Sequence, residues 1–292
     1  MTTLFLEKED CYRGPLILVN KSHPLRGATG PRQNAREKGS TGLLRAQEMM
    51  RKEDETGSDG SAKDGGLHGK WPDEGIVPVD ETCPEIGLDS QAARIYRKAL
   101  EELGCVGGVV PVSGYRTRAE QEAIYRDSLE ENGAEFTKKY VALPDCSEHQ
   151  TGLAIDLGEG GIPLDFIRPS FPDSGACGRF KRAAARYGFI LRYPAGKESV
   201  TGIAHEPWHF RYVGYPHSRI MEEREMVLEE YLEYLAKQAK DWLVWETGGR
   251  FIEIRYITAE EPVTKVEIPD GCLYQISGDN RNGFVVTVWR ER

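Results

Sequence analysis

Two short stretches of the sequence carry most of its chemical information: residues 147–156, SEHQTGLAID, and residues 206–209, EPWH. Three side chains within them are of the types that bind zinc: His149, Asp156 and His209. A catalytic zinc site typically takes three protein ligands and leaves its fourth position to water. These residues meet that count, and Glu206 remains as a nearby carboxylate of the kind that acts as a base.

A competing interpretation arises because residues 205–209 also match H-E-x-x-H, in which helical zinc proteases use both histidines as ligands. That pattern needs both histidines on one face of an uninterrupted helix. Pro207 has no amide hydrogen and disfavours helical geometry at Glu206 before it. The residues that follow alternate as in a half-buried strand. We therefore expect His209 to be the ligand, Glu206 to be the base and His205 to take no part.

Composition limits the class of protein. The chain has 292 residues, of which 39% are hydrophobic, enough for a substantial core. Its net charge of −9 argues against a nucleic-acid partner, whose phosphates require a basic surface. The six cysteines are scattered without a CxxC pair, so neither a structural zinc cluster nor a disulfide scaffold is indicated. The first residues, MTTLFL, predict neither a signal peptide nor a membrane span, so we expect a cytoplasmic location, with cell-envelope association as the alternative.

The first quarter of the chain changes composition after one apolar run. Residues 16–19, LILV, predict a strand, so residues 1–25 are interpreted as the N-terminal strand of the catalytic core. Residues 26–75 are rich in glycine and charged residues, which indicates a mobile insertion or linker. Within this segment only residues 42–52 are compatible with a short helix.

Residues 76–242 predict the catalytic domain, an α+β fold in which a small antiparallel sheet is flanked by helices. Helices are expected at residues 88–103, 117–131 and 176–187, and a long amphipathic helix at 222–239. Strands are expected at residues 109–112, 153–157, 189–191 and 209–213. A capping box at residues 117–120 places Arg116 at a strand-to-helix junction. Gly152 allows the chain to bend so that His149 lies over the strand that holds Asp156.

The last segment, residues 243–292, predicts a β-rich extension. Apolar runs at residues 251–258, 263–268, 272–277 and 284–289 are separated by the turn signals PDG and NG. We interpret them as a small β-meander that packs on the core or binds a protein partner.

The motifs resemble those of the D-alanyl-D-alanine carboxypeptidases of the VanY and VanXY type, zinc peptidases that trim cell-wall precursors in glycopeptide (vancomycin) resistance. The resemblance rests on S-x-H-x-x-G-x-A-x-D at residues 147–156, EPWH at 206–209 and SGYRT at 113–117. The resemblance spans about residues 76–235, and residues 16–24 show a weaker resemblance.

The resemblance implies a role for each matching residue. The ligands of one zinc ion per chain are then His149, Asp156 and His209, and the catalytic base is Glu206. Arg116 steadies the oxyanion or the substrate carboxylate, a task that suits a bidentate guanidinium. Ser147 and Gln121 match positions that contact substrate. Apart from the resemblance, we expect Trp208, beside His209, to form a wall of the substrate pocket or to pack in the core.

The implied function is removal of C-terminal D-Ala from peptidoglycan precursor peptides, which are then the expected partners. A D,D-dipeptidase that hydrolyses D-Ala-D-Ala, or an enzyme with both activities, remains open. From a different class, the chain could be a non-catalytic zinc-containing peptide-binding protein. Glu206 weighs against this last alternative, because a purely structural site has no use for a base.

Overall fold

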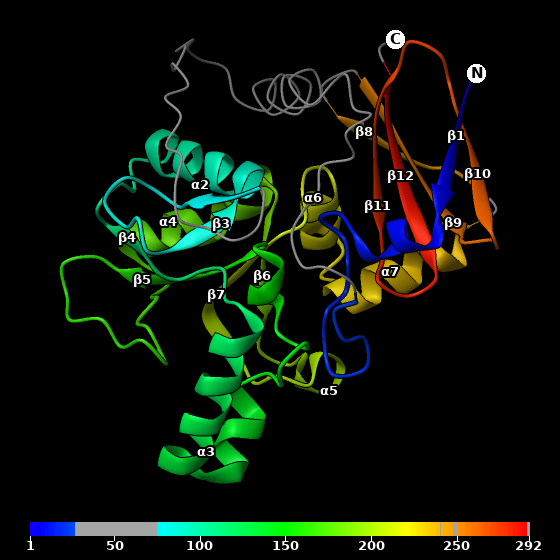
Figure 1. Cartoon of the computed structure of the whole chain (residues 1–292). Helices are drawn as coiled ribbons and strands as arrows, with labels where there is room; N and C mark the ends of the chain where they lie inside the picture. Colours follow the sequence, from blue (N-terminus) through cyan, green and yellow to red (C-terminus); the bar gives the residue numbers. More distant parts are fainter. Residues whose placement is uncertain (27–74, 240, 248–249, 291–292) are drawn as a thin grey trace. The chain divides into compact units, whose positions relative to one another are not determined.

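A computed structural model describes residues 1–26, 75–239, 241–247 and 250–290 of the chain. They fall into two compact units (Figure 1). The metal-site unit holds residues 18–26 and 75–229, and the terminal unit joins residues 1–17 to the described residues from 230 onwards. The predicted insertion at residues 26–75, with its helix at 42–52, lies almost wholly outside the described residues.

The metal-site unit contains a four-stranded antiparallel sheet in the order β4-β5-β7-β6. Its strands are β4 (Val109–Ser113), β5 (Ala154–Glu159), β6 (Phe189–Tyr193) and β7 (Glu206–Tyr212). Two short strands, β2 (Ile76–Pro78) and β3 (Gly87–Asp89), pair separately. The predicted α+β fold with a small antiparallel sheet is confirmed.

The helices of this unit are α2 (Ser90–Glu102), α3 (Arg118–Tyr140), α4 (Gly175–Ala183), α5 (Glu198–Thr201) and α6 (His217–Glu223), with the 3-10 turns η2 (Glu148–Thr151) and η3 (Ala184–Tyr187). The predicted capping box forms at the start of α3, where Thr117 and Glu120 exchange hydrogen bonds. This helix continues past its predicted end, across a break at Gly133 with a φ of 79°.

The prediction of a single long helix at residues 222–239 is wrong. Helix α6 ends at Glu223, and α7 (Leu228–Lys237) begins after an irregular turn. Glu225 in this turn has a φ of 52°, in the left-handed region that a continuous helix does not allow. The apolar periodicity of the sequence continues through the turn and therefore does not reveal it.

The two faces of the main sheet differ in chemistry because successive side chains of a strand point to opposite sides. On one face, Phe210 of β7 packs edge-on against Phe180 of α4 and against Phe171, with ring centroids 5.2 and 5.3 Å away. On the other face lie Asp156 of β5 and His209 of β7. The aromatic face supplies the core, and the polar face carries the candidate site.

The terminal unit is built from strands far apart in sequence. It contains β1 (Thr2–Glu7), η1 (Lys8–Tyr12), β8 (Leu243–Thr247), β9 (Arg250–Thr258), β10 (Val263–Ile268), β11 (Leu273–Gly278) and β12 (Gly283–Arg290). The main sheet has the order β11-β12-β9-β8, and β10 pairs with β1 (Figure 1). The prediction of a β-rich segment is confirmed. The prediction of a simple meander is wrong, because β12 lies between β11 and β9 in the sheet.

Residues 16–19 do not form the predicted strand, and the first strand is β1. This strand pairs with β10, so the N-terminal strand belongs to the terminal unit rather than to the catalytic core. Residues 16–19 are an irregular buried segment, in which the backbone amide of Leu16 donates to Ser277 Oγ at 2.9 Å. A short, continuous apolar run does not distinguish a buried strand from another buried segment.

Candidate active site

The register of the main sheet brings three site residues into one row. Asp156 of β5 lies directly opposite His209 of β7, and Ser113 of β4 lies opposite Asp156 on its other side. Opposing side chains of antiparallel strands lie about 5 Å apart. Residues separated by more than forty positions in the sequence are therefore neighbours here. The extended backbone of β7, which begins at Glu206, confirms that these residues do not form an H-E-x-x-H helix.

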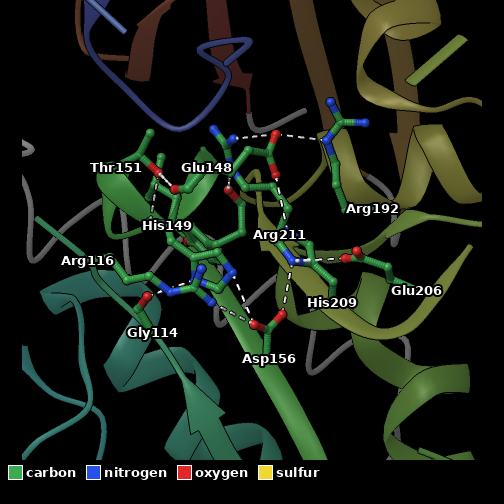
Figure 2. A network of polar contacts seen from close by, with 12 residues as sticks. Gly114, Arg116, Glu148, His149, Thr151, Asp156, Arg192, Glu206, His209 and Arg211 are labelled. Carbon is green, nitrogen blue, oxygen red and sulfur yellow. Dashed lines mark hydrogen bonds and ion pairs between the residues drawn. The ribbon is translucent and has the colours of Figure 1, made fainter. Parts of the chain in front are cut away.

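His149 reaches this row from the short turn η2. Gly152 ends the turn with a φ of 72°, and the chain then enters β5. This positive φ favours glycine, and a Cβ here would also lie 2.3 Å from Ile76 Cδ1, so the Ile76 side chain would have to move. The expected bend at Gly152 is confirmed. The Nδ1 of His149 lies 2.7 Å from the Gly114 carbonyl, which leaves its Nε2 directed at Asp156 (Figure 2).

The donor atoms of the three predicted ligands converge. One atom each from His149, Asp156 and His209 lies within 4.8 Å of the others, and all three residues are buried. Asp156 Oδ2 is 3.2 Å from His149 Nε2, and Asp156 Oδ1 is 3.0 Å from His209 Nδ1. Among the described residues Asp156 Oδ1 has no hydrogen-bond partner, although it is fully buried. Two imidazoles and a carboxylate around one point fit a divalent metal ion such as zinc.

The charges of the ligands differ in the metal-free chain. Burial raises the pKa of Asp156, but the neighbouring imidazoles outweigh it and hold this pKa well below its usual value. Burial, together with nearby Arg116, lowers the pKa of His149. Burial also acts to lower the pKa of His209, but the carboxylates of Asp156 and Glu148 raise it to about 9. At neutral pH the imidazole of His209 is therefore protonated at both nitrogens, and a metal ion has to displace one of these protons.

Glu206 lies beside the ligands without joining their group. Its Oε2 is 3.6 Å from His209 Nδ1, and only 6% of the residue is exposed (Figure 2). Burial, opposed by His209 and reinforced by Asp156, raises the pKa of Glu206 to about 8. A carboxylate whose pKa lies near neutrality can both accept and donate a proton at physiological pH.

Arg116 lies on the other side of Asp156, at the predicted junction between β4 and α3. Its NH2 donates to Asp156 Oδ2 at 3.2 Å and to Ser113 Oγ at 2.9 Å. Its NH1 donates to Gln121 Oε1 at 3.3 Å. The side chain remains 19% exposed, so this fixed guanidinium can still meet an anionic group.

The three residues predicted to bind substrate, Gln121, Ser147 and Trp208, are all buried. Gln121 is 1% exposed and holds Arg116, while its amide donates to the Ala142 carbonyl. Ser147 and Trp208 are buried, at 3% and 7% exposure. Direct contact of these three residues with substrate stays a prediction. His205 lies outside the ligand group, with its Nδ1 3.0 Å from the Tyr193 carbonyl.

Residues 88–215 match the family model described as VanY, D-alanyl-D-alanine carboxypeptidase. Over 159 residues the chain is 45% identical to the bifunctional D-Ala-D-Ala dipeptidase and D-Ala-D-Ala carboxypeptidase VanXYC of Enterococcus gallinarum. That alignment covers 54% of this chain and 84% of the relative. The chain belongs to the VanY family of D-alanyl-D-alanine carboxypeptidases.

The similarity extends over both units of this VanY-family chain. A D-alanyl-D-alanine carboxypeptidase of Enterococcus faecium is 33% identical over 291 residues, which cover 97% of this chain and 78% of the relative. The crystal structure of the vancomycin resistance D,D-dipeptidase VanXYg, in complex with a D-Ala-D-Ala phosphinate analog, gives a TM-score of 0.81 at 43% identity. This match covers 99% of both chains, so the β-rich terminal unit is shared with another solved structure.

Four residues that contact the candidate site, directly or through one another, were not predicted from the sequence: Ser113, Glu148, Arg192 and Arg211. Ser113 and Glu148 lie inside the quoted motifs, but nothing in the sequence separates them from neighbouring polar residues. Arg192 carries a clearer signal, because it interrupts the otherwise apolar and aromatic strand β6, and Arg211 lies between two aromatic residues of β7. A buried charge requires a partner, so arginines in such strands mark an internal network.

The proton held by His209 predicts how zinc binding to this VanY-family chain depends on pH. The raised pKa of His209 keeps its imidazole protonated below about pH 9 in the metal-free chain. Zinc affinity should therefore rise by about tenfold for each pH unit as the pH increases toward 9. Competition titrations with a chromophoric chelator, run at several pH values from about 6 to 9, measure this slope. A zinc affinity that is flat across this range would contradict the assignment of His209 as a ligand.

Proposed function

We propose that this chain is a zinc-dependent D-alanyl-D-alanine carboxypeptidase that removes C-terminal D-Ala from peptidoglycan precursor peptides. The observation that carries the proposal is the placement of Glu206. This buried carboxylate lies 3.6 Å from a nitrogen of the predicted ligand His209 but is not part of the ligand group. Structural zinc sites are closed by four protein ligands, whereas a three-ligand site beside a free carboxylate is typical of zinc hydrolases.

The residues that would hold the zinc ion, one per chain, are His149, Asp156 and His209. Their two nitrogens and one carboxylate oxygen match the ligand types of catalytic zinc sites. When bound, zinc supplies Lewis-acid activation of water and of the scissile carbonyl group. The negative charge of Asp156, whose pKa is held well below its usual value, is available to the ion at any physiological pH.

Glu206 supports hydrolysis through proton transfer. As water adds to the carbonyl carbon, a carbon–oxygen bond forms and the water proton moves to the Glu206 carboxylate. When the carbon–nitrogen bond breaks, the same carboxyl group returns this proton to the leaving amine of D-Ala. Burial raises the pKa of Glu206 to about 8, which brings it close to the range that suits both transfers.

Arg116 supports the same reaction by positioning and charge. Its guanidinium is held by Ser113, Gln121 and Asp156, so its orientation is fixed before substrate binds. A fixed cation at this position can stabilise the developing oxyanion or bind the terminal carboxylate of the substrate. The second task favours peptides that end in a free carboxyl group.

Hydrolysis of the free dipeptide D-Ala-D-Ala is a second activity that the relatives favour. VanXYC is named as bifunctional, and VanXYg was solved with a phosphinate analog of D-Ala-D-Ala. A phosphinate is tetrahedral, like the intermediate of amide hydrolysis, and such analogues bind more tightly than substrates. Both relatives are more than 40% identical to this chain, which supports a dual carboxypeptidase and dipeptidase.

Release of D-Ala from a muramyl pentapeptide and from D-Ala-D-Ala, with and without a chelator, tests the proposed function. We expect release from the pentapeptide, loss of all release after chelation, and recovery when zinc is added back. The ratio of the two rates defines the balance between carboxypeptidase and dipeptidase. Absence of release from both substrates in the zinc-loaded protein would favour the alternative of a zinc-containing peptide-binding protein.

Two further expectations stay predictions. No helix in the described part of the chain is long and apolar enough to cross a membrane. The cytoplasmic location, and a protein partner that binds the terminal unit, rest on the sequence alone.

A further inference from the structure

Three charged residues behind the ligand His209 are fully buried: Glu148 of η2, Arg192 of β6 and Arg211 of β7. None of them belongs to the catalytic machinery described above. Burial of an ion is costly unless a partner compensates for the lost hydration. The partners of these three side chains therefore indicate what the arrangement stabilises.

Both arginines contact the same oxygen of Glu148. Arg192 Nε donates to Glu148 Oε1 at 2.8 Å, and Arg211 NH1 lies 2.9 Å from that atom (Figure 2). The other nitrogens of Arg192 donate to the two carboxylate oxygens of Glu229 at 2.9 and 2.7 Å. Two guanidinium groups thus fix the position of the Glu148 carboxylate and leave its second oxygen, Oε2, free of both arginines.

This second oxygen faces the imidazole of His209. Glu148 Oε2 lies 3.5 Å from His209 Nε2, slightly farther than the usual length of a hydrogen bond. Both atoms are buried, and neither has a hydrogen-bond partner among the described residues. An ionised carboxylate only accepts hydrogen bonds, so the two atoms satisfy each other only if His209 carries its proton on Nε2. The proton that a metal ion displaces is then the one on Nδ1, which lies 3.0 Å from Asp156 in the ligand group.

The opposite arrangement holds for the other ligand histidine. His149 Nδ1 lies 2.7 Å from the carbonyl oxygen of Gly114, so this nitrogen carries the proton and Nε2 is the ligand atom. The rings of His149 and His209 are nearly perpendicular, at 88°, with centroids 5.0 Å apart. The ring of Tyr193 packs 4.8 Å from that of His209 and restricts its rotation. Each imidazole therefore has a fixed orientation and a fixed tautomer.

We propose that Glu148 is a positioning residue that fixes His209 as the Nε2-protonated tautomer, with Nδ1 directed at the metal, and that Arg192 and Arg211 hold Glu148 in place for this task. The proposal rests on the proposed function in one respect, because it takes His209 to be a metal ligand. Partners of this kind orient ligand histidines and increase their basicity, and their loss typically lowers metal affinity by about 10- to 100-fold.

A matched pair of variants tests the proposal: Glu148→Gln and Glu229→Gln. Both remove one buried carboxylate that contacts Arg192, but only Glu148 also faces His209. We expect Glu148→Gln to weaken zinc binding by about 10- to 100-fold and Glu229→Gln to leave it within about twofold. Zinc dissociation constants, measured on the full chain by competition with a chelator, give both values. Unchanged affinity in Glu148→Gln, or an equal loss in both variants, would overturn the proposal.

A spectroscopic measurement on the unmodified chain does not depend on how the variants fold. Nitrogen-15 NMR of histidine side chains, with cadmium-113 as an NMR-active substitute for zinc, identifies the nitrogen of each imidazole that binds the metal. We expect one ligand histidine bound through Nε2 and the other bound through Nδ1. Two histidines bound through Nε2 would overturn the proposal. Neither experiment uses hydrolysis, so a chain that binds metal as expected but releases no D-Ala would contradict only the proposed function.

Discussion

Replacement of Glu206 by glutamine is expected to lower hydrolysis of D-Ala-terminated peptides by about 10²- to 10⁴-fold, the range that a general acid–base residue contributes. Glutamine has nearly the same size and keeps the side chain in its buried position, but it cannot take a proton from water. Zinc binding should persist, at about one ion per chain, because three other residues supply the ligands. Turnover numbers and zinc content of the purified variant measure the two effects separately.

The pKa of Glu206 also predicts how hydrolysis by the unmodified enzyme depends on pH. In the metal-free chain burial raises this pKa to about 8, so the carboxyl group is mostly protonated at neutral pH. The charge of a bound cation favours the ionised form and lowers the pKa. The activity of the unmodified enzyme should therefore fall as pH drops through the pKa of Glu206 in the zinc-loaded site, since only the ionised carboxylate accepts a proton.

His205→Gln is the matched control, because it changes the other residue that the pattern H-E-x-x-H would assign to the site. Its Nδ1 contacts the Tyr193 carbonyl, and it lies outside the ligand group. We expect this variant to keep both zinc and turnover. Retained hydrolysis in Glu206→Gln would contradict its role as the base, and loss of zinc in His205→Gln would indicate that His205 is a ligand.

The part of the site that could be predicted from the sequence depends on local chemistry. Pro207 excludes a helix, and the observed strand from Glu206 to Tyr212 confirms that inference. Gly152 permits a left-handed turn, and the turn is present. The capping box before α3 fixes the place of Arg116. In each case a few neighbouring residues determine the backbone, so no knowledge of the tertiary structure is required.

The missed features depend on pairing between distant segments. Glu148 meets Arg192, Arg211 and His209 only because η2, β6 and β7 are neighbours in the folded unit. Likewise β1 pairs with β10 across more than 250 positions, and nothing in either strand specifies the other. Alternation of apolar residues shows that a strand has a buried face, but it does not identify the strand beside it. Sheet order and internal ion pairs therefore require the structure.

The Asp156→Asn substitution is expected to weaken zinc binding by more than about 100-fold. Removal of a residue that only supports a ligand typically costs about 10- to 100-fold, and Asp156 is itself an expected ligand. Asp156 supplies the one negative charge in the ligand group, and its two oxygens face His149 Nε2 and His209 Nδ1 at 3.2 and 3.0 Å. Asparagine keeps the shape but leaves a divalent cation with neutral ligands. Arg116, whose NH2 now donates to Asp156, would then repel the ion without compensation.

Asp89→Asn is the matched control for Asp156→Asn, because it neutralises another buried aspartate of the same unit. Asp89 caps α2 by accepting the amides of Gln91 and Ala92, and asparagine is an equally good cap. Burial raises the pKa of Asp89 to about 6, so the fold disfavours the charged form of this side chain relative to water. We expect wild-type zinc affinity in Asp89→Asn, measured by the same chelator competition. A tightly bound zinc ion in Asp156→Asn would remove Asp156 from the ligand set, because a neutral amide is a poor substitute for an anionic oxygen at zinc.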